Sequence, residues 1–136
     1  MDIPQHIWRF PTADAIASLA SRFQFVVDPL MQDPEVEFSD PQRIDEFLAV
    51  YEGGDLTEDE QFLLMEILLN SFEFAHVPLS SQPQWPRILE LLDRNIRVHI
   101  FSVLAFSDPG SDWTIGHGLL AIASKHRAAF GLSDAA

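Results

Sequence analysis

The pattern of apolar and polar positions along this chain has the period of an α-helix in most segments. The most apolar segment, residues 58–75, carries its polar side chains at Asp59, Glu66, Asn70 and Glu73. This spacing places them in one narrow stripe at 3.6 residues per turn. Because nearly every other position is apolar, the helix must be surrounded by protein on most sides. We therefore predict that residues 58–75 form the central helix of the fold.

Local signals define where the central helix begins and where the helix before it ends. Thr57 and Glu60 have the spacing of a capping box, in which each side chain bonds the backbone amide of the other residue. The Gly53-Gly54 pair ends the preceding helix, because glycine accepts the left-handed backbone of a helix C-terminus. The link between the two helices is short, so we expect them to pack as an antiparallel hairpin.

On the N-terminal side of this segment, two apolar stripes predict two helices. The first begins after Thr12, which suits an N-cap, and ends at about Val27. The second begins at Ser39, because Ser39 and Gln42 have the spacing of another capping box. The inward positions of these stripes are Ile16, Leu19, Ala20, Phe23, Val26, Val27, Ile44, Phe47, Leu48 and Tyr51.

On the C-terminal side, apolar stripes predict helices over residues 83–94 and 113–130, with Asp112 as the N-cap of the second. The segment 96–106 fits two structures. Its alternating β-branched residues favour a strand, whereas its apolar spacing fits a helix equally well. A lone strand would have nothing to pair with elsewhere in the chain, so we predict a helix.

Together these elements predict an all-α fold, a compact bundle or short solenoid of about five to six helices around residues 58–75. The length favours a single domain over residues 1–136. Outside the helices we expect an irregular start at 1–11, an extended acidic connection at 28–40 and a frayed tail at 131–136. Three Asp-Pro pairs indicate the extended connection, because a residue before proline avoids helical backbone.

The net charge of −13 is confined to one part of the sequence. Residues 1–80 contain 16 acidic and 3 basic residues, whereas residues 81–136 contain 5 of each. Such a field disfavours nucleic acid, anionic membranes and phosphate-rich ligands as partners, and it favours a basic protein. The acidity also has a simpler interpretation, which is that it only keeps the protein in solution.

Other features of the composition indicate a cytoplasmic protein. The sequence contains no cysteine, so disulfides, thiolate zinc sites and thiol catalysis are excluded. The first residues lack the basic and apolar regions of a signal peptide. No stretch approaches the roughly 18 uncharged apolar residues of a membrane span, so we predict no membrane association.

A search for metal-binding and catalytic patterns finds isolated residues only. Asp55 to Glu66 has the length of a calcium loop, but Glu60 stands where that loop requires glycine. Glu73-x-x-His76 has the spacing of di-iron carboxylate proteins, which need a second such motif and two further glutamates. We therefore predict that the chain is not an enzyme and has no catalytic residue, metal or cofactor.

The other histidines and the C-terminal bases are typical of structural or exposed positions. His99 lies in an apolar run, so we expect a hydrogen-bonded histidine in the core. We expect His117, Lys125, His126 and Arg127 to be ordinary exposed or helix-end residues.

What remains is an interaction surface on the predicted hairpin. Its acidic residues come from two helices and a short turn, so they should cluster at one end and attract a basic partner. The predicted partner-binding residues are Asp45, Glu46, Glu52, Asp55, Glu58, Asp59 and Glu60.

Two stretches carry a resemblance to a known group of proteins. They are YEGGDLTEDEQFLLMEILLNSF, from Tyr51, and WPRILELLDRNIRVHI, from Trp85. With its acidic helix start and apolar F-L-L-M-E-I-L-L core, the chain resembles the small acidic bacterial immunity proteins that neutralise secreted or contact-dependent toxins. The resemblance implies a cytosolic protein that occludes the active site of a cognate toxin, often a basic nuclease. It identifies no individual functional residue.

We therefore predict an immunity-type protein that binds and inhibits a cognate bacterial toxin through an acidic surface. The alternative is a non-catalytic helical adaptor or regulatory protein that binds another, basic protein. The sequence leaves open the identity of the partner, the oligomeric state and which surface makes the contact.

Overall fold

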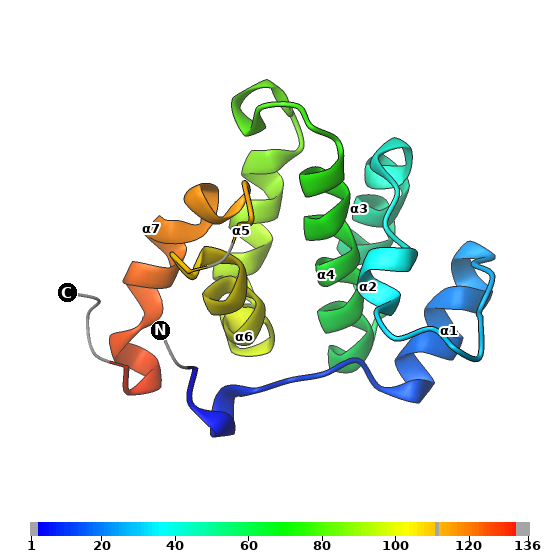
Figure 1. Cartoon of the computed structure of the whole chain (residues 1–136), viewed down its shortest axis with the longest axis horizontal. Helices are drawn as coiled ribbons and strands as arrows, with labels where there is room; N and C mark the ends of the chain where they lie inside the picture. The colour runs from blue at the N-terminus through cyan, green and yellow to red at the C-terminus, as the bar shows by residue number, and fades with distance from the viewer. Residues whose placement is uncertain (1–2, 111, 133–136) are drawn as a thin grey trace. The chain divides into compact units, whose positions relative to one another are not determined.

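The computed structural model describes residues 3–110 and 112–132, and the regular structure in these residues is entirely helical (Figure 1). The predicted all-α fold is confirmed. Residues 96–106 are helical, as predicted. Within the described residues, no helix has the length and apolar character needed to cross a membrane. The α-helices are α1 (Ala13–Phe23), α2 (Pro34–Glu37), α3 (Ile44–Glu52), α4 (Glu58–Phe74), α5 (Trp85–Arg94), α6 (Ile96–Ser107) and α7 (Gly116–His126).

The chain divides into two compact units. The first, Arg9–His76, contains α1 to α4, and we call it the acidic unit because it holds 15 acidic residues and 3 arginines. The second is formed by Met1–Trp8 and Val77–Ala136 and contains α5 to α7. We call it the split unit, since its two segments are separated in sequence by the acidic unit. The prediction of a single domain over residues 1–136 stays a prediction.

Helix α4 is the centre of the acidic unit, as its sequence predicts. It packs against α1, α2 and α3, and Figure 1 shows α2 and α3 beside it. Twelve of its residues are buried, including Glu66 and Asn70, so the middle of the predicted polar stripe is not solvated. Asn70 Nδ2 instead donates to the backbone carbonyl of Glu66 at 2.9 Å. A polar side chain buried on an apolar helix is tolerated when the backbone supplies its partner.

The junction between α3 and α4 forms as predicted. Both halves of the capping box are present: Glu60 N donates to Thr57 Oγ1 at 3.2 Å, and Thr57 N donates to Glu60 Oε1 at 2.9 Å. Gly54 has a φ of 81°, a left-handed conformation that glycine adopts without steric cost. The direction of the chain is therefore fixed locally on both sides of this turn.

Helix α1 is shorter than predicted. Thr12 caps it as expected, since Thr12 Oγ1 accepts from Ala15 N at 3.1 Å. The helix ends at Phe23 because Gln24 takes a left-handed conformation with a φ of 61°. The prediction that Val26 and Val27 continue the inward stripe is wrong, and both are exposed.

The acidic connection at 28–40 contains a helix that was not predicted. Asp33 is neither helical nor fully extended, with a φ of −125° and a ψ of 75°, and Pro34 then starts α2, where its missing amide costs nothing. The second predicted capping box is also wrong. Asp40, not Ser39, is the cap: its side chain accepts from Gln42 N at 2.9 Å and opens a 3-10 turn.

In the split unit, two glycines allow α7 to approach its neighbours closely. A Cβ on Gly116 would lie 2.4 Å from the carbonyl oxygen of Phe106 in α6. A Cβ on Gly118 would lie 2.8 Å from Leu79 Cδ1 and 2.9 Å from Trp85 Cζ2. At Gly116 the obstacle is backbone, so glycine is required there, whereas a larger residue at position 118 would have to displace the Leu79 and Trp85 side chains.

The ends of the split unit differ from prediction in three respects. Helix α7 begins at Gly116 rather than at 113, and no side chain caps it, so the proposed Asp112 cap is wrong. After α7 ends, a 3-10 turn follows at Ala128–Phe130. The predicted irregular start contains a 3-10 turn at Gln5–Ile7. Most of the predicted frayed tail, residues 133–136, lies outside the described residues, as do residues 1–2.

Candidate partner-binding surface

The seven predicted contact residues all lie in the acidic unit, on α3, on the following turn and in the first turn of α4. The structure does not place them in one cluster. Asp45 and Glu46 are at the start of α3 and Glu52 is at its end, about 10 Å apart along the helix axis at 1.5 Å per residue. The seven acids therefore lie at two separate places. Their contacts also differ, because some of them stabilise the fold and others remain exposed.

Glu60 is committed to holding the fold. It is buried, its carboxylate closes the capping box with Thr57, and it accepts a short hydrogen bond from the hydroxyl of Ser18 on α1. The Ser18 hydroxyl, followed by the Thr57 backbone amide, holds the pKa of Glu60 below its ordinary value. Its carboxylate joins α1 to the start of α4, and it is poorly placed to meet a partner.

Glu46 also has an internal role. Arg43 Nε and Nη2 each donate to its carboxylate at 2.8 Å, and this bidentate bond lowers the pKa of Glu46. The same guanidinium donates to the carbonyl of Phe23 at 2.9 Å. It also lies over three phenylalanine rings, at 5.2 Å from Phe25 and 5.4 Å from Phe47. Glu46 thus orients the arginine that covers this aromatic group.

Two acids near the α3–α4 turn form exposed ion pairs. Asp59 bonds Arg9 at 2.9 Å, and Asp55 lies 3.5 Å from Arg22. The side chains of Asp59 and Asp55 remain 50% and 66% exposed. Such solvent-exposed pairs contribute about 0–1 kcal/mol each, and a partner's cations can replace the arginines.

Four exposed acids therefore make up the candidate surface. We call them the acidic turn, and they surround the junction that Gly54 and the capping box fix. Glu52 and Glu58 are exposed along with the two ion-paired aspartates, so the carboxylates face solvent on a backbone of defined geometry. The acidic turn consists of Glu52, Asp55, Glu58 and Asp59.

A second acidic group lies on α2, where sequence reasoning placed an extended chain. Burial raises the pKa of Glu35, and the neighbouring charges of Asp33 and Glu37 raise it further. Burial and like charge thus disfavour the charged form here. The signal that could have found this group is Asp33-Pro34, which suits the start of a helix as well as an extended segment.

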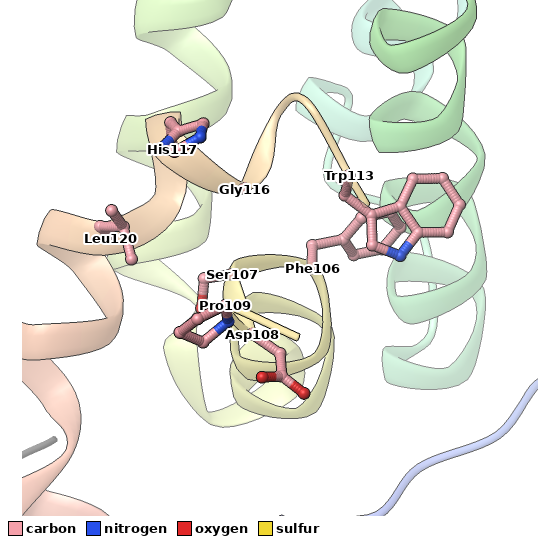
Figure 2. A pocket seen from close by; sticks show the side chains of 8 residues that line it. All are labelled: Phe106, Ser107, Asp108, Pro109, Trp113, Gly116, His117 and Leu120. Carbon is pink, nitrogen blue, oxygen red and sulfur yellow. The ribbon is translucent and has the colours of Figure 1, made fainter. Parts of the chain in front are cut away.

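The split unit contains a small pocket of about 120 Å³. Figure 2 shows the rings of Phe106 and Trp113 on one side, with His117 and Leu120 on the other and Gly116 between them. The carboxylate of Asp108 points away from the His117 ring, so the two do not form an acid–base pair. The pocket is mainly aromatic and apolar, and sequence reasoning did not identify it.

The titratable residues of the split unit that sequence analysis singled out are buried or lie beside oppositely charged groups. His99 is fully buried in α6, as predicted for a core histidine. Arg127 lies at the end of α7, as one of the two expected positions, and its side chain is buried there. Asp93 lies 2.6 Å from His126 Nε2 and 3.0 Å from Lys125 Nζ. His126 first, then Lys125, lowers the pKa of Asp93.

The isolated Glu73-x-x-His76 motif acquires no further ligands. Glu73 is in the last turn of α4, and His76 follows the helix with a left-handed φ of 53°. Within residues 3–110 and 112–132, no group of three or more histidine, aspartate or glutamate side chains could hold a metal ion.

Comparisons with known proteins give no further guidance. No protein-family model matches the chain, and neither a curated protein nor a solved structure does.

Proposed function

We propose that this chain is an immunity-type protein that binds and inhibits a cognate bacterial toxin through the acidic turn. The proposal is carried by one observation. Four carboxylates, of Glu52, Asp55, Glu58 and Asp59, remain exposed at a junction whose backbone is fixed by a capping box and a left-handed glycine. Because the backbone that carries these carboxylates is already fixed, binding has little backbone to order, and the acids suit recognition of a basic protein surface.

The distribution of charge in the acidic unit supports the same function. The unit's three arginines all pair with acids of the predicted contact set, and twelve acids remain in excess. A surplus of this size steers a positively charged partner and raises its association rate at low salt. The resemblance to immunity proteins implies that the partner is a toxin, often a basic nuclease, and that the two proteins meet in the cytoplasm.

The function is tested by expressing the product of the neighbouring gene with and without this chain. We expect toxicity that is relieved only by co-expression, and a 1:1 complex of the two purified proteins. A neighbouring product that is harmless without this chain contradicts the proposal. Binding without toxicity would instead favour an adaptor or regulatory protein.

The acidic turn is tested by neutralising three of its charges in the variant Glu52→Gln/Asp55→Asn/Glu58→Gln. Because steering depends on local charge, we expect association to slow about tenfold at low salt and its salt dependence to flatten. Glu60 is left intact, since its loss would disturb the start of α4. Stopped-flow or surface-plasmon measurements at several salt concentrations give these rates.

The matched control removes three charges elsewhere in the same unit, outside the acidic turn and outside α2, in the variant Asp14→Asn/Asp45→Asn/Glu73→Gln. Its net charge equals that of the first variant. Any difference between their association rates therefore depends on where the removed charges lie. Equal slowing of association by both variants would show that only net charge matters, and the acidic turn would not be the docking site.

A further inference from the structure

The segment between α1 and α2 exposes large apolar side chains on an ordered turn. Val26 is 90% exposed and Leu30 is 84% exposed, and Val27 is about half exposed. These side chains fall within five consecutive residues, and we call residues 26–31 the apolar turn. Scattered exposed apolar residues are common on proteins, but several together on one projecting turn mark an interaction site.

Hydrogen bonds define the shape of this turn. Met31 N donates to the carbonyl of Asp28 at 2.9 Å, and Leu30 N donates to the Asp28 side chain, also at 2.9 Å. Proline at position 29 sets its own φ, which suits the second residue of a turn. Leu30 is therefore presented at the tip of a turn whose backbone is already arranged.

Both ends of the segment are attached to the core of the acidic unit. Phe25 stacks on the buried Phe38, with ring centroids 4.3 Å apart, and its amide donates to the carbonyl of Ala20. Pro34, which follows the segment, is buried in α2, and α2 packs against α4. The chain on both sides of the turn is therefore held by the core, while the side chains of Val26, Val27 and Leu30 face solvent.

The charge around the turn restricts what can cover it. Asp28 and Asp33 lie within and beside the segment, and Glu35 and Glu37 follow on α2. A second copy of this chain would bring the same acidic unit, with twelve uncompensated negative charges, against its equal. An anionic membrane would be repelled in the same way. Only a positively charged partner matches both the apolar tip and its acidic surroundings.

We propose that the apolar turn inserts Val26 and Leu30 into an apolar cleft of the partner protein whose rim carries lysine or arginine. A projecting turn fits a concave site, so this contact would fill the partner's cleft while the acidic turn provides steering. The inference rests on the proposed function, because it names a second contact to the same basic partner. We expect the apolar turn to control how slowly the complex dissociates and the acidic turn to control how fast it forms.

The test measures binding of the neighbouring gene product to the variant Val26→Ser/Leu30→Ser. Since both side chains are exposed, we expect an unchanged melting temperature. We expect the dissociation rate to rise about tenfold or more, with the salt dependence of association retained. The control is Val77→Ser/Leu120→Ser, which removes one exposed valine and one exposed leucine from the split unit. We expect its affinity to stay within about twofold of the original.

Each outcome bears on one of the two proposals. If the unaltered chain does not bind the neighbouring product, the proposed function fails and this inference fails with it. If the unaltered chain binds and the Val26/Leu30 variant dissociates no faster, only this inference is overturned. It is also overturned if sedimentation shows a homodimer that the variant abolishes, because a second copy would then cover the turn.

Discussion

The two units of this protein use charged residues in opposite ways. In the acidic unit, 15 acids face 3 arginines, and each arginine is paired with an acid of the predicted contact set. The described part of the split unit contains four acids and five bases, and pairs such as Glu90–Arg94 and Asp93–Lys125 join them. In the split unit, the numbers of acidic and basic residues are nearly equal. The acidic unit instead retains a surplus of negative charge that an external partner can meet.

The units also differ in what fixes their packing. The acidic unit relies on local devices that are visible in the sequence, such as the Thr57–Glu60 capping box. The split unit relies on the close approach of α7, which Gly116 and Gly118 permit. A sequence shows the first kind of device directly, but the second depends on which helix lies opposite. Substitutions in the two units test what stabilises each of them, in descending order of expected effect.

The largest effect is expected for Gly116→Ala in the split unit. The new Cβ would meet the backbone oxygen of Phe106 at 2.4 Å, and a backbone atom cannot move aside as a flexible side chain can. We expect the free energy of unfolding to fall by about 2–3 kcal/mol, measured by urea denaturation. Gly110→Ala is the control, because its Cβ would meet only the Asp108 side chain at 3.6 Å. Equal stability of the two variants would contradict the close approach.

A smaller effect is expected for Thr57→Ala in the acidic unit. The substitution removes the acceptor for the amide of Glu60 at the start of α4, and loss of such a cap costs about 1 kcal/mol. Thermal unfolding followed by circular dichroism measures the change. Ser124→Ala, which removes an exposed hydroxyl from α7, should stay within about 0.5 kcal/mol of the original. A Thr57→Ala variant as stable as this control would show that the capping box adds nothing.

The smallest effect has the opposite sign and depends on pH. The pKa of Glu35 is raised, so its charged form weakens the fold above its ordinary pKa. Glu35→Gln should therefore raise stability at neutral pH by up to about 0.5 kcal/mol, and the gain should vanish as pH falls below the ordinary pKa of glutamate.

Glu60→Gln provides the contrast within the same unit. The pKa of Glu60 is lowered, so its charged form stabilises the fold at neutral pH, and this contribution is lost as pH falls through the lowered value. Unfolding measured at neutral and acidic pH should thus show a gain for Glu35→Gln and a loss for Glu60→Gln. Changes of the same sign at neutral pH would contradict these assignments.

Local signals account for the parts of the fold that the sequence predicted correctly. The start of α4 and the turn at Gly54 each depend on residues next to one another in the chain. Errors arose where two neighbouring residues could perform the same task, or where a residue adopted an uncommon backbone conformation. Asp40 caps the turn before α3 although Ser39 has the better-known spacing, and Gln24 ends α1 although glutamine rarely adopts a left-handed φ.

The sequence identified the acidic residues of the candidate site but not the role that each one has. Sequence reasoning assigned Glu60 both a capping role and a contact role, and only its burial against α1 separates the two. Glu46 has the same difficulty, since the Arg43 guanidinium that it holds lies over an aromatic group drawn from three segments. The exposed apolar turn was missed because Val26 fits the period of α1, which stops three residues earlier.

The order in which the two units lie along the chain has a consequence for their synthesis. Residues of the acidic unit are contiguous, so all of them have left the ribosome's catalytic centre before most of the split unit is made. At about 5–20 residues per second, the rest of the described chain takes roughly 3–11 s. During this interval the surface proposed to meet the toxin can already form. Pulse proteolysis of stalled nascent chains would time its appearance.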